Sequence, residues 1–160
     1  MADKWNLEFH PPPSGSLYFL RINPTNDTAQ VVGDTHYSNW LKWNGAALAP
    51  NGKIYSAPYG TGILVIDTND DSCYVIGETI YGIYSKPVTA PNGKIYCLPY
   101  GSSTILCIDP ATDAIEEIGP FEEMPRYVHY YENAVVANNG RIYGISRHGG
   151  KIIEVAGVGA

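Results

Sequence analysis

Apolar residues along the chain occur in short runs, each bounded by Gly, Pro, Asn or Asp. No window of about eleven residues repeats its apolar positions with the three-to-four-residue spacing of an amphipathic helix. Short apolar runs that end at turn-forming residues are typical of β-strands. The pattern therefore predicts an all-β protein. The numbers of Tyr (13), Gly (17) and Pro (12) agree with strands joined by turns.

The predicted strands belong to a unit that the chain repeats. The sequence APNGKIY begins at Ala49 and again at Ala90, and a weaker copy, ANNGRIY, begins at Ala137, so the starts are 41 and 47 residues apart. Both strong copies continue into a similar run, ILVID or ILCID, and then into a run that ends in Ile-Gly. The sequence of each unit therefore predicts four strands. The first strand of the unit covers 46–48, 88–89 and 134–136 in the three copies. The second covers 53–57 and 94–98, the third 63–67 and 105–109, and the fourth 73–77 and 115–119.

The Asn-Gly pair of the phrase predicts a tight hairpin turn in which both residues take positive φ. A unit of four short strands that recurs every 41 to 47 residues has the spacing of a β-propeller blade. The stretch APNGKIY with ILCIDPATDAIEEIG resembles the repeat of streptogramin-lyase-like, NHL-type and related propellers. That repeat carries an Asp/Asn-Gly turn, an aromatic second strand and an Ile-Asp-Pro-x-Thr turn. The resemblance implies four-stranded antiparallel blades over nearly the whole chain.

We expect one β-propeller domain, or partial propeller, over 1–160, with repeat units at roughly 5–36, 40–80, 81–121 and 125–157. Two units are complete; the leading one keeps at best its last three strands and the trailing one its first three. Such an arc of about three to four blades has open sheet edges, which favour pairing with another chain. The chain could join its own partial blades, combine with further copies, or be a fragment of a longer propeller. We favour self-association as a dimer or higher ring.

Two sets of repeated side chains have structural interpretations. Asp67, Asp109 and Asn23 begin equivalent turns, where the side chain caps its own backbone; we expect no metal site there, and no other metal or cofactor. Tyr55, Tyr96 and Tyr143 share one strand register, which predicts packing between neighbouring blades.

Other aromatic and basic residues are candidates for binding a ligand or a partner. Trp43, Tyr84 and Tyr131 each stand six residues before the repeated phrase, in or beside the loop that joins two blades, where packing and stacking on a ligand both remain open. Tyr59 and Tyr100 lie in the loop between the second and third strands, and the third copy has Arg147 and His148 in that place. The remaining candidates, Arg126 and Tyr127, lie in an expanded segment before the third copy.

The function that these residues favour is a non-catalytic binding or scaffold module that recognises a protein or a glycan through aromatic loops. No phosphate-binding loop, nucleophile elbow or zinc-binding pattern occurs in the sequence. The resemblance implies an alternative, a streptogramin-lyase-like enzyme with a His base and a supporting Mg²⁺. His129 and His148 are then the candidate bases. A third possibility is a structural protein whose product is the assembled ring.

The net charge and the cysteines indicate which partners and which cellular location to expect. The net charge of −6 disfavours nucleic acid and anionic membranes as partners. No secretion signal and no long apolar run is visible, so we expect a cytoplasmic location. Cys73, Cys97 and Cys107 show no paired spacing, which favours reduced thiols inside strands.

Overall fold

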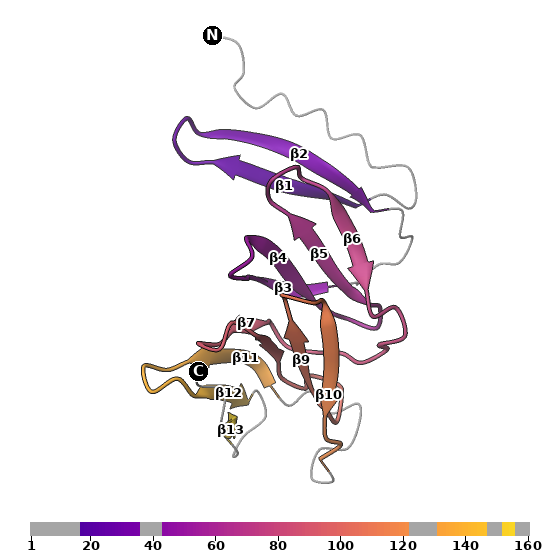
Figure 1. The fold of residues 1–160 in the computed structure, drawn as a ribbon, viewed down its shortest axis with the longest axis vertical. Helices are drawn as coiled ribbons and strands as arrows, with labels where there is room; N and C mark the ends of the chain where they lie inside the picture. Colours follow the sequence, from indigo (N-terminus) through magenta and orange to yellow (C-terminus); the bar gives the residue numbers. More distant parts are fainter. Residues whose placement is uncertain (1–16, 36–42, 122–130, 147–151, 156–160) are drawn as a thin grey trace. The chain divides into compact units, whose positions relative to one another are not determined.

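The computed structural model describes residues 17–35, 43–121, 131–146 and 152–155 (Figure 1). Contacts divide the chain into two compact units, 1–40 and 41–160, which are described separately. All regular structure in the described residues is β-strand, as the apolar pattern predicted. No helix among these residues is long and apolar enough to cross a membrane.

The first unit contains one antiparallel hairpin, called the N-terminal hairpin, made of β1 (Leu17–Asn23) and β2 (Thr28–Thr35). Its sequence matches the third and fourth strands of the repeat. The turn has the predicted capping, because Asn23 Oδ1 accepts a hydrogen bond from the Thr25 N–H at 3.0 Å. Asp27 in this turn has a φ of 52°.

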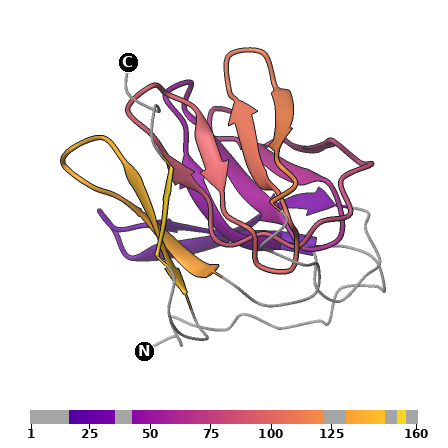
Figure 2. The same cartoon turned by 90° about the horizontal axis from the view of Figure 1, so that it is seen from below.

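The second unit contains three antiparallel sheets (Figure 1; Figure 2). Blade A has four strands in chain order: β3 (Trp43–Leu48), β4 (Lys53–Pro58), β5 (Ile63–Asp67) and β6 (Cys73–Ile76). Blade B repeats that order with β7 (Val88–Thr89), β8 (Ile95–Cys97), β9 (Ile105–Asp109) and β10 (Ala114–Ile118). Blade C has three described strands, β11 (Tyr131–Val136), β12 (Ile142–Ser146) and β13 (Ile153–Val155).

The strands lie at the predicted places, but the prediction for the Asn-Gly turn was wrong in detail. Only the glycine takes positive φ, at 81° for Gly52, 79° for Gly93 and 77° for Gly140. The Gly52 N–H donates to the Ala49 carbonyl at 3.0 Å, and the Ala49 N–H donates to the Lys53 carbonyl at 2.9 Å. This is a three-residue loop with a left-handed glycine rather than a two-residue turn. The third copy forms the same loop with Asn138 in place of Pro50, so the proline is not the cause. In all three copies the Asn side chain accepts a hydrogen bond from the N–H two residues later, at 2.9–3.0 Å, and this cap holds the loop.

The predicted side-chain caps at the turns after β5 and β9 are confirmed. Asp67 Oδ1 accepts from the Asn69 N–H and Asp109 Oδ1 accepts from the Ala111 N–H, each at 3.0 Å. The carboxylates are therefore used to order their own turns.

Two apolar cores hold the second unit together. The first lies between blades A and B and includes Tyr55, Val65, Leu106 and Ile108. The second lies between blades B and C and includes Tyr96, Leu98 and Ile142. Tyr55 and Tyr96 are buried, so the packing predicted for this register is confirmed for them; Tyr143 is half-buried.

The cysteines are unpaired and lie in strands, as predicted. Cys97 and Cys107 are buried, and burial raises the pKa of both thiols above the ordinary value. A raised pKa keeps a thiol protonated and poorly nucleophilic, so these residues fill the cores.

Candidate functional site

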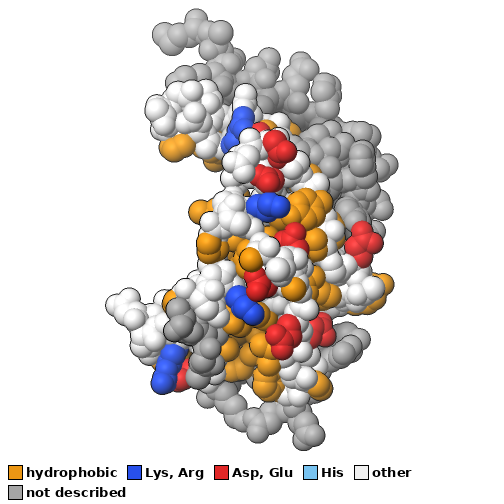
Figure 3. Space-filling view, viewed as in Figure 1, with side chains coloured by type: hydrophobic (Ala, Val, Ile, Leu, Met, Phe, Trp, Pro, Cys, Tyr) orange, Lys and Arg blue, Asp and Glu red, His pale blue; other side chains and the backbone are white. Residues whose placement is uncertain are grey.

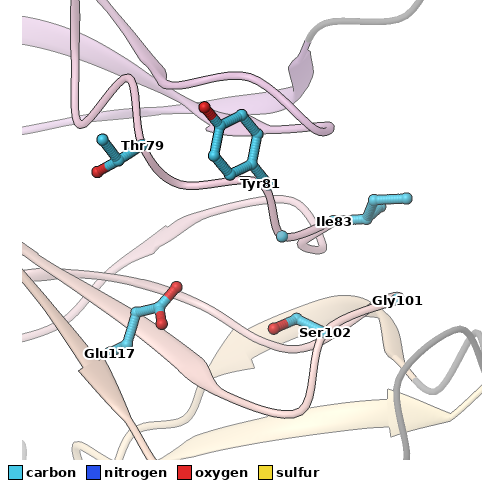
Figure 4. Close-up of a pocket in the computed structure, with 7 residues that line it drawn as sticks. Thr79, Tyr81, Ile83, Gly101, Ser102 and Glu117 are labelled. Atoms are coloured by element: carbon cyan, nitrogen blue, oxygen red, sulfur yellow. The ribbon is translucent and has the colours of Figure 1, made fainter.

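A cavity of about 270 Å³ lies between blade B and the link that joins blades A and B (Figure 4). Its walls come from the link between β6 and β7, from the loop between β8 and β9, and from β10. The lining residues are Thr79, Tyr81, Gly82, Ile83, Gly101, Ser102 and Glu117. We call this the Tyr81 pocket.

An aromatic ring and a set of polar groups face each other in the Tyr81 pocket. Figure 4 shows Thr79 and Tyr81 on one wall, and Glu117 and Ser102 on the opposite wall. The Tyr81 side chain is 77% exposed, although aromatic rings of this size usually find cover. The pocket therefore combines an exposed aromatic ring on one wall with hydrogen-bonding groups on the other.

A buried tyrosine holds the polar wall in place. The Tyr84 hydroxyl lies 2.7 Å from Thr104 Oγ1 and donates to Glu117 Oε1 at 2.9 Å. Ser102 Oγ donates to the Tyr84 hydroxyl at 3.3 Å. Glu117 on β10 and Ser102 in the loop between β8 and β9 are thus fixed relative to each other by one residue of the preceding link.

A glycine allows the Tyr84 ring to take this position. A Cβ on Gly82 would lie 2.4 Å from the Tyr84 ring, which is closer than real Cβ contacts. Residue 82 must therefore lack a side chain for the ring to reach Glu117.

The environment of Tyr84 keeps its hydroxyl protonated. Burial and, to a smaller extent, the nearby Glu117 carboxylate raise the pKa of Tyr84 to about 12, although hydrogen bonds from Ser102 and Thr104 act in the opposite direction. The phenol is therefore a neutral donor at physiological pH and does not serve as a base.

We expect the stability of the protein to fall between pH 10 and 12, in part through Tyr84. The folded state binds the phenolic proton more tightly than the unfolded state, so the stabilisation is complete below the unfolded pKa near 10 and is lost as the pH rises to about 12. Urea unfolding across this range should show a loss of about 2 kcal/mol from this group. Tyr84→Phe should flatten the profile, whereas Tyr81→Phe, at an exposed position, should leave its slope unchanged. An equal slope in the Tyr84→Phe protein would contradict this assignment.

The structure places five of the predicted binding residues. Tyr59 and Tyr100 lie in the predicted loops, with ring centroids 6.3 Å apart and planes inclined by 42°. Trp43 is half-buried and its indole N–H donates to the Gly62 carbonyl at 2.9 Å. Tyr84 and Tyr131 are buried, so in this chain they take the packing role that the sequence left open. The other candidates, Arg126, Tyr127, His129, Arg147 and His148, lie outside the described residues.

Sequence reasoning missed the residues that form the Tyr81 pocket. It selected aromatic residues that recur in register, and Tyr81 stands outside those registers. Glu117 looked like one of two ordinary strand residues in IEEIG. The available signal was the Tyr-Gly-Ile-Tyr stretch from Tyr81 to Tyr84, in which a glycine separates two aromatic residues within a turn-rich link.

The charged side chains of the described part of the chain show no arrangement for a metal or a polyanion. No group of three or more His, Cys, Asp or Glu residues is placed to hold a metal ion there. Figure 3 shows acidic and basic side chains interspersed on the visible face. Lys53 and Lys94 lie 3.9 and 3.8 Å from the carboxylates of Asp67 and Asp109, respectively.

Comparisons with known proteins define the class of the fold. No family model matches the chain, and no curated protein sequence matches it. Solved structures do match. Virginiamycin B lyase from Staphylococcus aureus has a TM-score of 0.62 at 14% identity, over 86% of this chain and 48% of that chain. A streptogramin B lyase has a TM-score of 0.56 at 17% identity, over 83% and 42% of the two chains. The dihydro-heme d1 dehydrogenase NirN has a TM-score of 0.60 at 17% identity, over 92% and 31%.

These similarities confirm the fold inferred from the repeat. The chain is an all-β protein built of β-propeller blades, and its structural neighbours include the streptogramin B lyases whose repeat it resembles. It spans about half the length of the two lyases, or less, and about a third of NirN. At this level of identity the likeness concerns the fold, on which many different functions occur.

Proposed function

We propose that the protein is a non-catalytic binding module that takes one neutral sugar ring of a glycan in the Tyr81 pocket. The observation that carries the proposal is an exposed Tyr81 ring on the wall opposite Glu117 and Ser102, in a cavity of about 270 Å³. A sugar ring has an apolar C–H face that packs on an aromatic ring and hydroxyl groups that donate to a carboxylate.

The size and charge of the pocket support this class of ligand. Sites for drug-sized ligands measure about 300–1,000 Å³, so this smaller cavity suits a single ring. The described lining residues carry one carboxylate, that of Glu117, and no cationic side chain, which disfavours anionic ligands.

The chemistry of the lining supports binding rather than catalysis. Among the described residues that line the pocket, none is His or Cys. Tyr84 keeps its proton because its pKa is about 12, and its hydroxyl already occupies one oxygen of Glu117. These groups orient a ligand through hydrogen bonds, and nothing in the lining supplies a base and a nucleophile within reach of each other.

We expect a set of methyl hexosides to include at least one that binds with a dissociation constant of about 1 mM, since about 0.3 kcal/mol for each non-hydrogen atom gives that affinity for so small a ligand. Tyr81→Ala should weaken binding about tenfold through the loss of the packed ring. Glu117→Gln, which keeps the side-chain shape, should weaken it about fivefold to tenfold. Titration calorimetry or ligand-observed NMR measures these changes, and Leu48→Ala, at an exposed site in blade A, is the control.

Other outcomes would contradict the proposal. If Tyr59→Ala abolishes binding while Tyr81→Ala leaves it intact, the sugar binds at the pair of Tyr59 and Tyr100. If no methyl hexoside binds, the pocket does not recognise a sugar. If the protein cleaves a streptogramin B antibiotic with Mg²⁺ and loses this activity in His129→Ala or His148→Ala, it is a lyase of the kind that two structural neighbours represent.

A further inference from the structure

Hydrogen bonds to one aspartate hold blades A and B together. Asp113, in the turn between β9 and β10, accepts a hydrogen bond from the Tyr55 hydroxyl at 2.6 Å through Oδ1 and one from the Tyr74 hydroxyl at 3.0 Å through Oδ2. Asn51 Nδ2 lies 3.2 Å from the Tyr55 hydroxyl and donates to the Pro110 carbonyl at 2.8 Å. A turn of one blade is thus bound to the second strand and the first turn of the blade before it.

Apolar residues complete this contact. Leu106 and Ile108 on β9 pack in one core with Tyr55 and Val65 of blade A, and Leu106 and Ile108 have no exposed surface. The interface between blades A and B therefore has two halves. The donor half is an Asn–Tyr pair on the leading blade, and the acceptor half is an Asp with two apolar residues on the following blade.

Blade C carries a donor half that the other described residues leave partly exposed. Asn139 Nδ2 donates to the Tyr143 hydroxyl at 3.0 Å, which repeats the pairing of Asn51 with Tyr55. The Tyr143 hydroxyl donates no hydrogen bond to another described residue. Tyr143 and Ile145, which alternate on β12, hold the positions of Tyr55 and Ala57, yet Ile145 is 56% exposed, whereas Ala57 is buried.

The N-terminal hairpin carries an uncovered acceptor half. Asp27 stands four residues after Asn23, as Asp113 stands four residues after Asp109, and both have left-handed φ, 52° and 56°. Leu20 and Ile22 hold the positions of Leu106 and Ile108, but they are 59% and 63% exposed. The carboxylate of Asp27 makes no hydrogen bond or ion pair with another described residue.

We propose that the N-terminal hairpin of a second copy of this chain packs on blade C and reproduces the contact between blades A and B. Asp27 of the second copy then accepts a hydrogen bond from Tyr143, and Leu20 and Ile22 of the second copy cover Ile145. The length of the chain favours a second copy as the partner that covers blade C. One chain spans 48% and 42% of the two lyases, so two chains together approach the length of one such propeller.

The contact is of the head-to-tail kind, since each copy presents a donor half at blade C and an acceptor half at the hairpin. Two such contacts close a ring of two chains. They cover the exposed residues of blade C and of the N-terminal hairpin in both copies. This proposal does not depend on the Tyr81 pocket, which lies between blade B and the link that joins blades A and B in a single copy.

The test is the mass of the full chain in solution, measured by analytical ultracentrifugation over a range of concentrations. We expect a dimer for the unmodified chain. Ile22→Glu and Ile145→Glu, which each place a charge in one half of the contact, should both give monomers. Leu48→Glu is the matched control, because Leu48 is 65% exposed but lies in neither half; it should remain a dimer.

Mixing the two monomeric variants distinguishes this contact from other modes of pairing. The Ile22→Glu protein keeps an intact blade C and the Ile145→Glu protein keeps an intact hairpin, so the mixture can form one native contact and should regain dimers. Neither variant alone should do so. An interface of any other geometry would not be rescued in this way.

Milder variants keep the test valid if the charged ones fail to fold. Tyr143→Phe and Asp27→Asn should each raise the dimer dissociation constant about tenfold. The combined variant should be no weaker than Tyr143→Phe alone, because both substitutions act on the same hydrogen bond. A chain that is monomeric at every concentration, as closure within one chain would give, overturns the proposal. So does a dimer that tolerates Ile22→Glu and Ile145→Glu.

Discussion

Asp113→Ala is expected to lower the free energy of unfolding by about 3 kcal/mol. The substitution removes the acceptor for two tyrosine hydroxyls, and Tyr55, which has no exposed surface, would keep a hydroxyl without an acceptor. An unsatisfied buried polar group costs about 1–3 kcal/mol, and a hydrogen bond to a charged group contributes about 1.5–3 kcal/mol. Urea unfolding followed by tyrosine fluorescence or circular dichroism measures the change.

Two related variants identify the source of this loss. Asp113→Asn keeps a residue that tolerates the φ of 56°, so it removes the negative charge with little backbone strain. It should cost about 1–2 kcal/mol, less than Asp113→Ala. Tyr74→Phe removes one of the two donors and should cost about 1 kcal/mol. If Asp113→Ala destabilises the protein no more than Tyr74→Phe does, the buried Tyr55 hydroxyl does not depend on this carboxylate.

The repeat made most of the fold predictable from the sequence. A blade is a local structure: its four strands follow one another along the chain, and the apolar runs, the glycines and the side-chain caps mark where each strand begins and ends. The capping roles of Asp67 and Asp109 were predictable for the same reason, because the atoms they bond lie two residues away. The conformation of the Asn-Gly loop was not, since the Asn side chain caps the loop and only the glycine takes positive φ.

The contacts between blades were much less predictable. Tyr55 and Asp113 are 58 residues apart, and no local pattern shows that a turn of one blade reaches a strand of the blade before it. The Tyr81 pocket was also hard to predict, because its two walls come from residues far apart in sequence. The search for repeated aromatic residues found Tyr84 and Tyr131, and their register follows from packing between blades. The Tyr81 pocket is formed by residues that do not recur from blade to blade, so a comparison of the repeats does not reveal it.

Leu106→Ala is expected to lower the free energy of unfolding by about 3–4 kcal/mol, since the side chain is fully buried in the core between blades A and B and its removal leaves a cavity. Leu20→Ala makes the same change at the equivalent position of the N-terminal hairpin, where the side chain is 59% exposed. In a dilute, monomeric protein this change should cost less than about 0.5 kcal/mol. The comparison isolates burial, because the residue type, the strand and the register are the same.

The protein concentration connects this comparison with self-association. If a second copy covers Leu20, the cost of Leu20→Ala should rise as the concentration rises, because only the dimer buries the side chain. The cost of Leu106→Ala should stay constant, since its surroundings lie within one chain. Urea unfolding at concentrations below and above the dimer dissociation constant measures both. A cost of Leu20→Ala that is small at every concentration would mean that no copy covers the hairpin, and a cost as large as that of Leu106→Ala in the monomer would mean that its own chain does.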